Sequence, residues 1–481
     1  MIELTLGEIA RIVEGTLHAA DPAAVVTGTV EFDSREVTPG GLFLALPGER
    51  VDGHDYVAPA RDAGAVAAVV TRPVAGPAIQ VTDGFAALAA LAAAVLRRLP
   101  EVTVIGVTGS SGKTSTKDVL AQVLARLGAT VAPPGSYNNE LGHPYTVLRA
   151  TPETRFLVLE TSARGIGHIR FLTEIAPPRI GVVLNVGTAH LGGFGSQAAI
   201  AQAKGELVEA LPADGVAILN ADDPLVAAMA ARTRARIVTF GTAEAADVRA
   251  EDVTLDELGR PAFVLAAGGA RAAVTLRVVG GHQVSNALAA AAVVLECGMP
   301  LGDVAAALAA ATPVSRWRME VSERADRVLV INDAYNANPE SMRAALTALV
   351  AVARPRRASG ARSFAVLGPM AELGPNDTAA HEEVGRLAAH LDVSRVVAVG
   401  EQARPIAHSA ALEGSWHGES SWVPDVDAAV ALLRADLRAG DVVLVKASRA
   451  ASLERVALRI AGDSVFARDG AGPASGNGGR A

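Results

Sequence analysis

Residues 106–114, with the sequence GVTGSSGKT, have the composition of a loop that binds phosphate. They follow an apolar β-branched run and precede a helical pattern, so backbone amides and a helix N-terminus would point at one anion. In such loops the lysine, here Lys113, reaches the β- and γ-phosphates, and the next hydroxyl, here Thr114, ligates Mg²⁺. Val107 stands where strict Walker spacing requires glycine, and Gly109 adds a glycine. The segment predicts a variant nucleotide loop; the alternative is an ordinary Gly/Ser-rich turn.

Three more residues have side chains that suit a metal site beside this loop. Glu160 follows FLVL, His190 lies in VLNVGTAHL and Lys204 in IAQAKGEL, and we expect all three just after apolar strands, where doubly wound sheets place ligands. The carboxylate suits Mg²⁺, and the imidazole would complete a second site. The ammonium of Lys204 would repel a metal unless CO₂ converted it to a carbamate, which resembles a carboxylate. The alternatives are a structural histidine and a solvated helix lysine.

Lysine is scarce in this chain, which makes each one informative. Of 43 basic residues only four are lysines: Lys113, Lys117, Lys204 and Lys446. An ammonium is a compact charge for phosphate and a nucleophile, which guanidinium is not, so each position invites a chemical reason.

Composition excludes several classes of protein. The net charge of -8 argues against a nucleic-acid scaffold, which carries a basic stripe. The single cysteine, Cys297, excludes a disulfide within the chain and favours a reducing compartment. The N-terminus lacks the pattern of a signal peptide, and the apolar stretch 85–96 is shorter than the roughly 20 residues of a membrane span. We therefore expect a cytoplasmic protein without membrane insertion, and a packed helix at 85–96.

The order of apolar runs predicts an α/β protein of three domains. Short strands and the packed helix form a small α/β domain at 1–99, and the phosphate loop opens a doubly wound domain at 100–312, with a β-rich segment at 247–279 as an insertion. Strands and helices alternate again in a Rossmann-like domain at 313–462. Residues 463–481 are Gly-rich and nearly without apolar side chains, which predicts a disordered tail.

Taken in order, these motifs resemble the Mur ligase family over about 460 residues. The resemblance is carried by GVTGSSGKT, YNNELGHP at 137–144, Glu160, NVGTAHL, AKGEL, GGHQVSN at 280–286, Arg316 and NDAYNANP at 332–339. Within the family, DAYNANP and VLGPMAELG resemble the members that join D-alanyl-D-alanine to UDP-N-acetylmuramoyl-tripeptide.

The resemblance implies an ATP-dependent ligase that forms a C–N bond. The γ-phosphate of ATP would pass to the tripeptide carboxylate, and the amine of D-alanyl-D-alanine would attack the acyl phosphate, giving the pentapeptide precursor of peptidoglycan, ADP and phosphate. Two Mg²⁺ ions would neutralise charge, the second bound by carbamylated Lys204 with Glu160 and His190. We expect small-molecule substrates, no nucleic acid and a monomer.

The resemblance also assigns roles to individual residues. Lys113, His190, Lys204 and Arg316 are expected to be catalytic, and Thr114, Glu160, His190 and Lys204 to bind metal. ATP is expected to contact Gly109, Ser110, Ser111, Gly112, Lys113, Thr114, Ser115, His282, Asn286, Arg316, Asp333 and Asn336. The UDP substrate is expected to contact Ser34, Arg35, Asn138, Asn139, Thr161 and Ser162. Lys446 fits the late lysine of the family and is expected to contact the peptide or the nucleotide.

Three positions depart from the family pattern, and several rival functions stay open. Pro369 replaces an acidic residue, Ala447 replaces glycine and Ser162 stands where glycine is common, which weakens any assignment of the dipeptide pocket.

Arg35 is alternatively a surface arginine in a turn, and NDAYNANP an Asx-rich turn before a helix. The rivals are a sister ligase that adds a single amino acid, a folylpolyglutamate synthetase and a non-catalytic nucleotide-binding protein.

Overall fold

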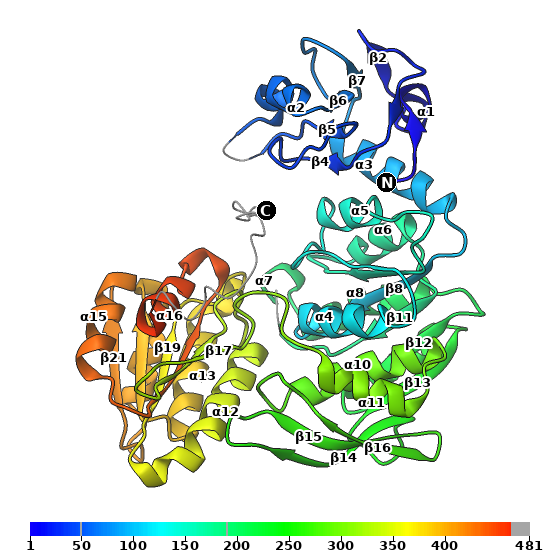
Figure 1. The fold of residues 1–481 in the computed structure, drawn as a ribbon. Coiled ribbons are helices and arrows are strands. Elements are labelled where there is room, and N and C mark those ends of the chain that lie inside the picture. Colours follow the sequence, from blue (N-terminus) through cyan, green and yellow to red (C-terminus); the bar gives the residue numbers. More distant parts are fainter. Residues whose placement is uncertain (49–50, 189–190, 463–481) are drawn as a thin grey trace. The chain divides into compact units, whose positions relative to one another are not determined.

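The computed structural model describes residues 1–48, 51–188 and 191–462, and its ribbon is drawn in Figure 1. The chain divides into two compact units. The first comprises Met1–Asp256 and Arg260–Arg316, and the second comprises Glu257–Gly259 and the chain from Trp317 onward. The predicted tail at 463–481 lies outside the described residues, and the three predicted domain boundaries stay predictions.

The first hundred residues build a small sheet with strand order β2-β7-β6-β5-β4, in which β2 is antiparallel to β7 and the other neighbours are parallel. A separate antiparallel pair joins β1 and β3. The strands are β1 (Leu4–Thr5), β2 (Thr16–His18), β3 (Val25–Val26), β4 (Val30–Glu31), β5 (Leu42–Leu44), β6 (Ala67–Val70) and β7 (Ala78–Gln80), and the helices α1 (Leu6–Ile12), α2 (Val57–Asp62) and α3 (Gly84–Arg97). The expected packed helix is confirmed as α3, which Asp83 caps by accepting from the amides of Phe85 and Ala86.

The centre of the first unit is a nine-stranded sheet with order β16-β15-β14-β13-β12-β11-β8-β10-β9. Its strands are parallel from β9 through β14, and β15 and β16 follow antiparallel. They are β8 (Thr103–Thr108), β9 (Thr130–Val131), β10 (Phe156–Glu160), β11 (Ile180–Val183), β12 (Val216–Asn220), β13 (Arg236–Gly241), β14 (Val248–Leu255), β15 (Pro261–Ala267) and β16 (Ala270–Thr275). The expected insertion at 247–279 therefore continues the sheet itself.

Helices cover both faces of this sheet. Ile105 and Val107 of β8 pack into a core with α4 and α10, whereas Val104, on the other face, packs into a core that includes α3. This two-sided burial is why the strands read as unbroken apolar runs. The helices are α4 (Lys113–Leu124), α5 (Gly142–Val147), α6 (His168–Ile175), α7 (Leu191–Phe194), α8 (Gln197–Glu209), α9 (Pro224–Ala227), α10 (Gln283–Glu296) and α11 (Leu301–Ala310), with a 3₁₀ helix, η2, at Ala228–Arg232.

The second unit is a six-stranded sheet with order β17-β18-β22-β19-β20-β21, parallel except for β17. Asn338 caps α12 and Pro339 begins it, which confirms the predicted proline-started helix. The elements are β17 (Glu320–Glu323), β18 (Leu329–Asn332), β19 (Ser363–Leu367), β20 (Arg395–Val399), β21 (Glu419–Val423), β22 (Val442–Lys446), α12 (Pro339–Arg356), α13 (Asp377–His390), α14 (Arg404–Ala411), α15 (Val426–Asp436) and α16 (Glu454–Ala461). The predicted α/β fold class is confirmed.

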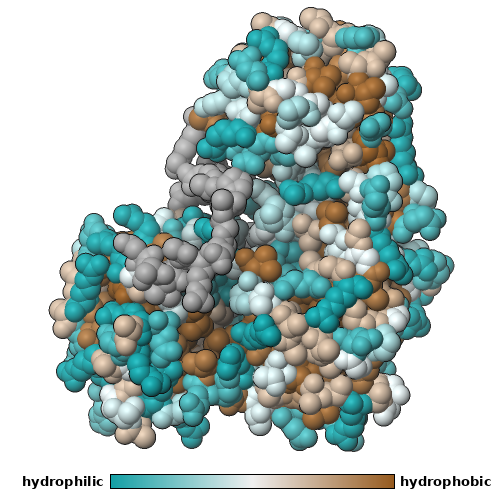
Figure 2. Space-filling view, viewed as in Figure 1, coloured by the Kyte–Doolittle hydropathy of each residue, from teal (hydrophilic) through white to brown (hydrophobic). Residues whose placement is uncertain are grey.

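The surface in Figure 2 mixes hydrophobic and hydrophilic side chains. On the face shown in Figure 2, hydrophobic residues lie in small groups among hydrophilic ones. In the part of the chain that the structure describes, no helix has the length and hydropathy needed to cross a membrane.

Candidate active site

The predicted phosphate loop connects β8 to α4. Gly112 has a φ of +82°, and a Cβ added there would lie 2.5 Å from the Oδ1 atom of Asn286, so the position requires glycine. The amide of Ser111 donates to Asn185 Oδ1 over 3.0 Å, and Lys113 Nζ donates to the Gly109 carbonyl over 2.6 Å. Among the described residues no side chain caps the N-terminus of α4. The amides of its first turn are therefore suited to a bound anion.

Glu160, the last residue of β10, lies beside this loop and is fully buried. Its Oε2 atom accepts from the hydroxyls of Thr114 (3.4 Å) and Ser136 (3.3 Å) and from the side-chain amide of Asn138 (3.3 Å). Its Oε1 atom is buried without a hydrogen-bond partner among the described residues. A buried carboxylate oxygen without a partner is costly, and a bound cation would satisfy it. The donor set therefore fits a hard metal ion.

Lys204 is not at the end of a strand, so that expectation is wrong. It lies in the middle of α8, which Ser196 caps, and its side chain is buried. The solvated-lysine alternative is wrong too. The expectation failed because an Ala-rich helix has little polar periodicity to separate it from a strand and its following loop. His190, the other predicted ligand, lies outside the described residues.

Two charged side chains hold the part of α8 that carries Lys204. Arg232 donates to the carbonyls of Ala201 (3.1 Å) and Gln202 (2.8 Å) of α8, and a Cβ added at Gly205 would lie 1.8 Å from its Nη1 atom. Glu206, also buried, accepts from the amides of Gly167 (2.5 Å) and Arg170 (3.0 Å) at the start of α6. The glycine after Lys204 thus makes room for a guanidinium that holds the helix.

The candidate substrate amides are already engaged with the site. Asn138 donates to Glu160, and its carbonyl accepts from the amide of Ser162 over 3.2 Å. Asn139 Oδ1 accepts from the Gly142 amide over 2.9 Å. Thr161 is buried, and its hydroxyl donates to the carbonyl of Val107 over 3.3 Å. The structure therefore brings Asn138 and Ser162 to Glu160, while Thr161 ties β10 to β8.

Three family models match successive parts of the chain. They are described as Mur ligase family, catalytic domain (residues 28–103), Mur ligase middle domain (107–294) and Mur ligase, glutamate ligase domain (317–449). A relative from Mycobacterium tuberculosis, named UDP-N-acetylmuramoyl-tripeptide–D-alanyl-D-alanine ligase, is 56% identical and aligns over 96% of this chain and 98% of its own. The chain belongs to the Mur ligase family.

Solved structures agree with this assignment of the Mur ligase. The structure titled MurF from Acinetobacter baumannii superposes with a TM-score of 0.84 at 32% identity, covering 94% of this chain and 98% of that one. The MurF ligase from Thermotoga maritima, solved in complex with ADP, gives a TM-score of 0.76 at 31% identity, covering 90% and 96%.

The residues of the Mur ligase that were predicted to contact ATP differ in burial and in hydrogen bonding. Asn286 is buried, accepts from the Thr116 hydroxyl (3.3 Å) and donates to Gln283 (2.9 Å), while His282 precedes the first residue of α10. Ser115 is half-buried on α4, and Arg316, the last residue of the first unit, is exposed. Asn286 thus supports the phosphate loop from behind Gly112.

In the second unit, Asp333 forms a buried ion pair. Its Oδ2 atom accepts from Lys446 Nζ over 2.6 Å, and its Oδ1 atom accepts from the Met319 amide over 3.1 Å. Lys446 also donates to the carbonyl of Asn336 over 2.9 Å. Burial lowers the pKa of the Lys446 ammonium, against the opposing effect of Asp333. This pair fixes the NDAYNANP loop to the end of β22.

The predicted uridine-side residues lie in a turn after β4. The Arg35 side chain is 70% exposed and pairs with Asp33 over 2.5 Å, which raises the pKa of Arg35 and lowers that of Asp33. Ser34 is half-buried beside it. An exposed guanidinium already oriented by a carboxylate is accessible to an anionic ligand.

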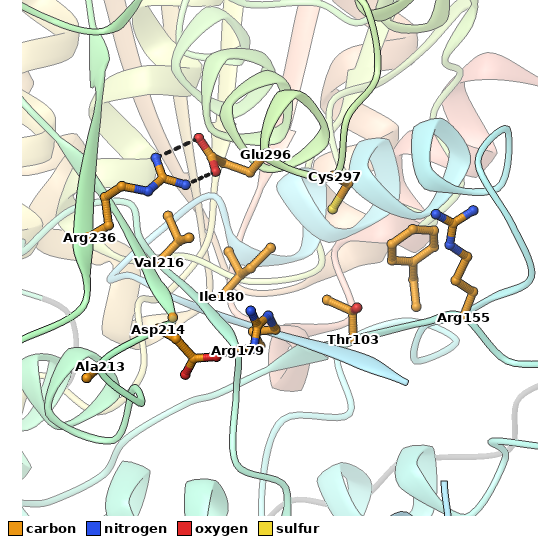
Figure 3. A pocket seen from close by; sticks show the side chains of 12 residues that line it. Thr103, Arg155, Arg179, Ile180, Ala213, Asp214, Val216, Arg236, Glu296 and Cys297 are labelled. Carbon is orange, nitrogen blue, oxygen red and sulfur yellow. Dashed lines mark hydrogen bonds and ion pairs between the residues drawn. The ribbon is translucent and has the colours of Figure 1, made fainter. Parts of the chain in front are cut away.

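A cavity of about 380 Å³ lies at the opposite edge of the central sheet (Figure 3). Its lining includes the first residues of five strands: Thr103, Phe156, Ile180, Val216 and Arg236. Two of its exposed arginines form ion pairs, Arg236 with Glu296 and Arg179 with Asp214 (2.7 Å), and a third, Arg155, donates to the carbonyl of Leu127 over 2.8 Å. The phosphate loop follows the carboxyl end of β8, so this cavity is separate from the candidate active site.

Sequence reasoning missed several residues of the site. Ser136 and Asn185 contact Glu160 and the phosphate loop, respectively, and the polar Asn185 directly after an apolar strand was a usable signal. Glu206 lies in the AKGEL motif but received no role, and Arg232 gave no signal, because their partners are distant in sequence and are mostly backbone groups.

Proposed function

We propose that this chain joins D-alanyl-D-alanine to UDP-N-acetylmuramoyl-tripeptide at the expense of ATP, giving the UDP-N-acetylmuramoyl-pentapeptide of peptidoglycan synthesis, ADP and phosphate. The observation that carries the proposal is the buried carboxylate of Glu160 beside an intact phosphate loop. The relative that carries this name in Mycobacterium tuberculosis aligns over nearly the whole of both chains.

ATP is the proposed phosphoryl donor. The loop at 109–115 and the N-terminus of α4 would hold its phosphates, with Lys113 on the β- and γ-phosphates and Asn286 supporting the loop. ADP in the Thermotoga maritima structure supports this ligand class. Asp333 and Asn336, from the second unit, would face the ribose and adenine. Arg316, the last residue of the first unit, would reach the phosphates.

The metal ligands we propose are Thr114, Glu160, His190 and carbamylated Lys204, for two Mg²⁺ ions. When bound, the ions would neutralise the triphosphate and the substrate carboxylate, which otherwise repel each other. The unpartnered Oε1 atom of Glu160 supports the site. Lys204 is buried on a helix that Arg232 and Glu206 hold, so its backbone position is fixed.

In the reaction, a carboxylate oxygen of the tripeptide attacks the γ-phosphorus of ATP and the bond to ADP breaks. The amine of D-alanyl-D-alanine then attacks the acyl carbon, loses a proton and expels phosphate. Asn138 and Asn139 would orient the precursor at the carboxylate, with Thr161 and Ser162 beside them. Ser34 and Arg35 would hold the uridine diphosphate end, where a guanidinium matches a diphosphate.

We also propose that the enzyme works as a monomer in the cytoplasm, where ATP is available. The half-buried Cys297, at the end of α10, is compatible with a reducing compartment. Pro369, Ala447 and Ser162 leave the dipeptide pocket unassigned.

Carbamylation of Lys204 has its own test. Incubation with ¹³C-bicarbonate is expected to give a carbamate signal in the NMR spectrum of the wild-type protein and none in Lys204→Ala. The variant is expected to lose most activity, and a short carboxylic acid is expected to restore part of it. Full activity in Lys204→Ala would remove the residue from the metal site.

The function is tested by phosphate release from ATP with UDP-N-acetylmuramoyl-tripeptide and either D-alanyl-D-alanine or single amino acids. Release with a pentapeptide product in the presence of the dipeptide alone is expected. Turnover with a diamino acid or glutamate would make the chain a sister ligase. If no acceptor gave phosphate release, a non-catalytic nucleotide-binding protein would be favoured.

A further inference from the structure

The segment 311–316, called here the linker, follows α11 and leads into the second unit. Two side chains of α4 hold it within the first unit. Gln122 accepts from the Thr312 amide over 3.0 Å and donates to the Thr312 carbonyl over 2.9 Å. Asp118 Oδ2 accepts from the Ser315 amide over 3.0 Å. The phosphate-loop helix therefore binds the linker backbone at both of its ends.

Lys117 fixes Asp118 in turn. The two side chains form an ion pair, and both are buried, with relative exposures of 2% and 7%. Lys117 Nζ also donates to the Pro133 carbonyl over 2.9 Å, three residues before Ser136, which donates to Glu160. A compact ammonium can bridge a carboxylate and a carbonyl in this confined space, which explains the fourth lysine.

The spacing along α4 joins these contacts to the phosphate loop. Thr114, Asp118 and Gln122 follow one another at intervals of four, so they lie along one side of the helix, about 6 Å apart per step. Because the helix is rigid over this length, the linker backbone has a fixed position relative to Thr114. Arg316 immediately follows the anchored Ser315.

We propose that Asp118 and Gln122 are positioning residues: by holding the linker backbone, they set the position of the Arg316 backbone relative to the bound phosphates. The inference rests on the proposed function, in which Arg316 reaches those phosphates. A small shift of a charged group costs a large factor in rate because the transition state needs that group in place. Loss of an anchor would therefore lower kcat and leave the phosphate loop itself intact.

The test compares Gln122→Met with the wild type. Methionine keeps the length of the side chain and removes every hydrogen bond from Gln122 to Thr312, the longer one from the Thr312 hydroxyl (3.5 Å) included. Asp118 is left unchanged because its loss would leave the buried ammonium of Lys117 without its partner. We expect kcat to fall by about tenfold, with the Kd for ADP, measured without other substrates, unchanged within about twofold. Gln122→Glu, which can still accept from Thr312, is expected to recover part of kcat. Gln402→Met, at an exposed position of the second unit, is the control.

A double-mutant cycle separates positioning from a general loss of structure. If Gln122 acts through Arg316, then Gln122→Met adds no further loss of kcat in an Arg316→Ala background. A double variant that is worse by the full factor of Gln122→Met would overturn the inference, as would an unchanged kcat in Gln122→Met. A neutral Arg316→Ala would overturn both the inference and the assigned role of Arg316, whereas the ligase reaction itself is tested by the wild-type product.

Discussion

Replacement of Glu160 by glutamine is predicted to abolish activity without destabilising the metal-free protein. The carboxylate is fully buried, and its Oε1 atom has no hydrogen-bond partner among the described residues. An unsatisfied buried polar group costs about 1–3 kcal/mol, and more when charged. The neutral amide of Glu160→Gln removes the buried charge, so the free energy of unfolding in EDTA is expected to stay equal or rise by about 1–2 kcal/mol.

The matched control is Glu206→Gln. Glu206 is equally buried, but its two oxygens each accept from a backbone amide, Gly167 and Arg170. An amide group there would set a donor against a donor, so this variant is expected to lose about 1–3 kcal/mol of stability. The opposite signs distinguish a carboxylate kept for a ligand from one kept for structure.

Urea unfolding of both variants, in EDTA and with Mg²⁺ and ADP, measures the difference. The wild type is expected to gain about 2.7 kcal/mol when the ligand stands at 100 times its Kd, and Glu160→Gln much less at the same concentration. The reasoning is refuted if Glu160→Gln loses more than about 1 kcal/mol in EDTA, beyond the extrapolation error of the method, or if the variant keeps wild-type kcat.

Three further predictions concern single positions. Gly112→Ala is expected to weaken ADP binding at least about tenfold in a calorimetric titration, because its Cβ would lie 2.5 Å from Asn286. Gly135→Ala, measured in the same way, is the control for backbone strain, because Gly135 has a φ of +89° and no described atom lies within 4 Å of an added Cβ. Gly205→Ala should gain about 1 kcal/mol of helix propensity but displace Arg232, whose charged hydrogen bonds are worth about 1.5–3 kcal/mol each. The free energy of unfolding in urea is therefore expected to fall, and a rise would contradict the packing of Arg232 against Gly205. Burial raises the pKa of the Cys297 thiol to about 11, so its thiolate, and its alkylation by iodoacetamide, should increase tenfold per pH unit between pH 8 and pH 10; a plateau near pH 9 would show an unshifted thiol.

The sheets were predictable because their strands are buried on both faces. Val104 and Ile105 face opposite cores, so alternation is replaced by an unbroken apolar run that the sequence shows directly. The phosphate loop was predictable because its backbone needs glycine at a left-handed position and its anion needs a lysine, here Lys113, at a fixed spacing from that glycine. The helix α3 was predictable from its Ala/Leu pattern, and its N-cap, Asp83, was a further signal that the prediction did not use.

The sequence failed to place residues whose contacts are distant along the chain or whose helix has a weak hydrophobic pattern. Lys204 was placed at the end of a strand, although Ser196 gave a usable N-cap signal for α8. The contact of Arg232 with that helix depends on how the chain packs, and no local pattern reports it. Asn286 is not among these failures: its side chain packs against Gly112 and Thr116, and its predicted contact with ATP stays a prediction.

The central chemical claim is that a tripeptide carboxylate is phosphorylated in this site before the amine attacks. Tripeptide precursor labelled with ¹⁸O in its reacting carboxylate, incubated with enzyme, ATP and D-alanyl-D-alanine, tests it most directly. The account predicts one ¹⁸O atom in each phosphate released, measured by mass spectrometry. Phosphate without the label, released together with pentapeptide, would contradict it.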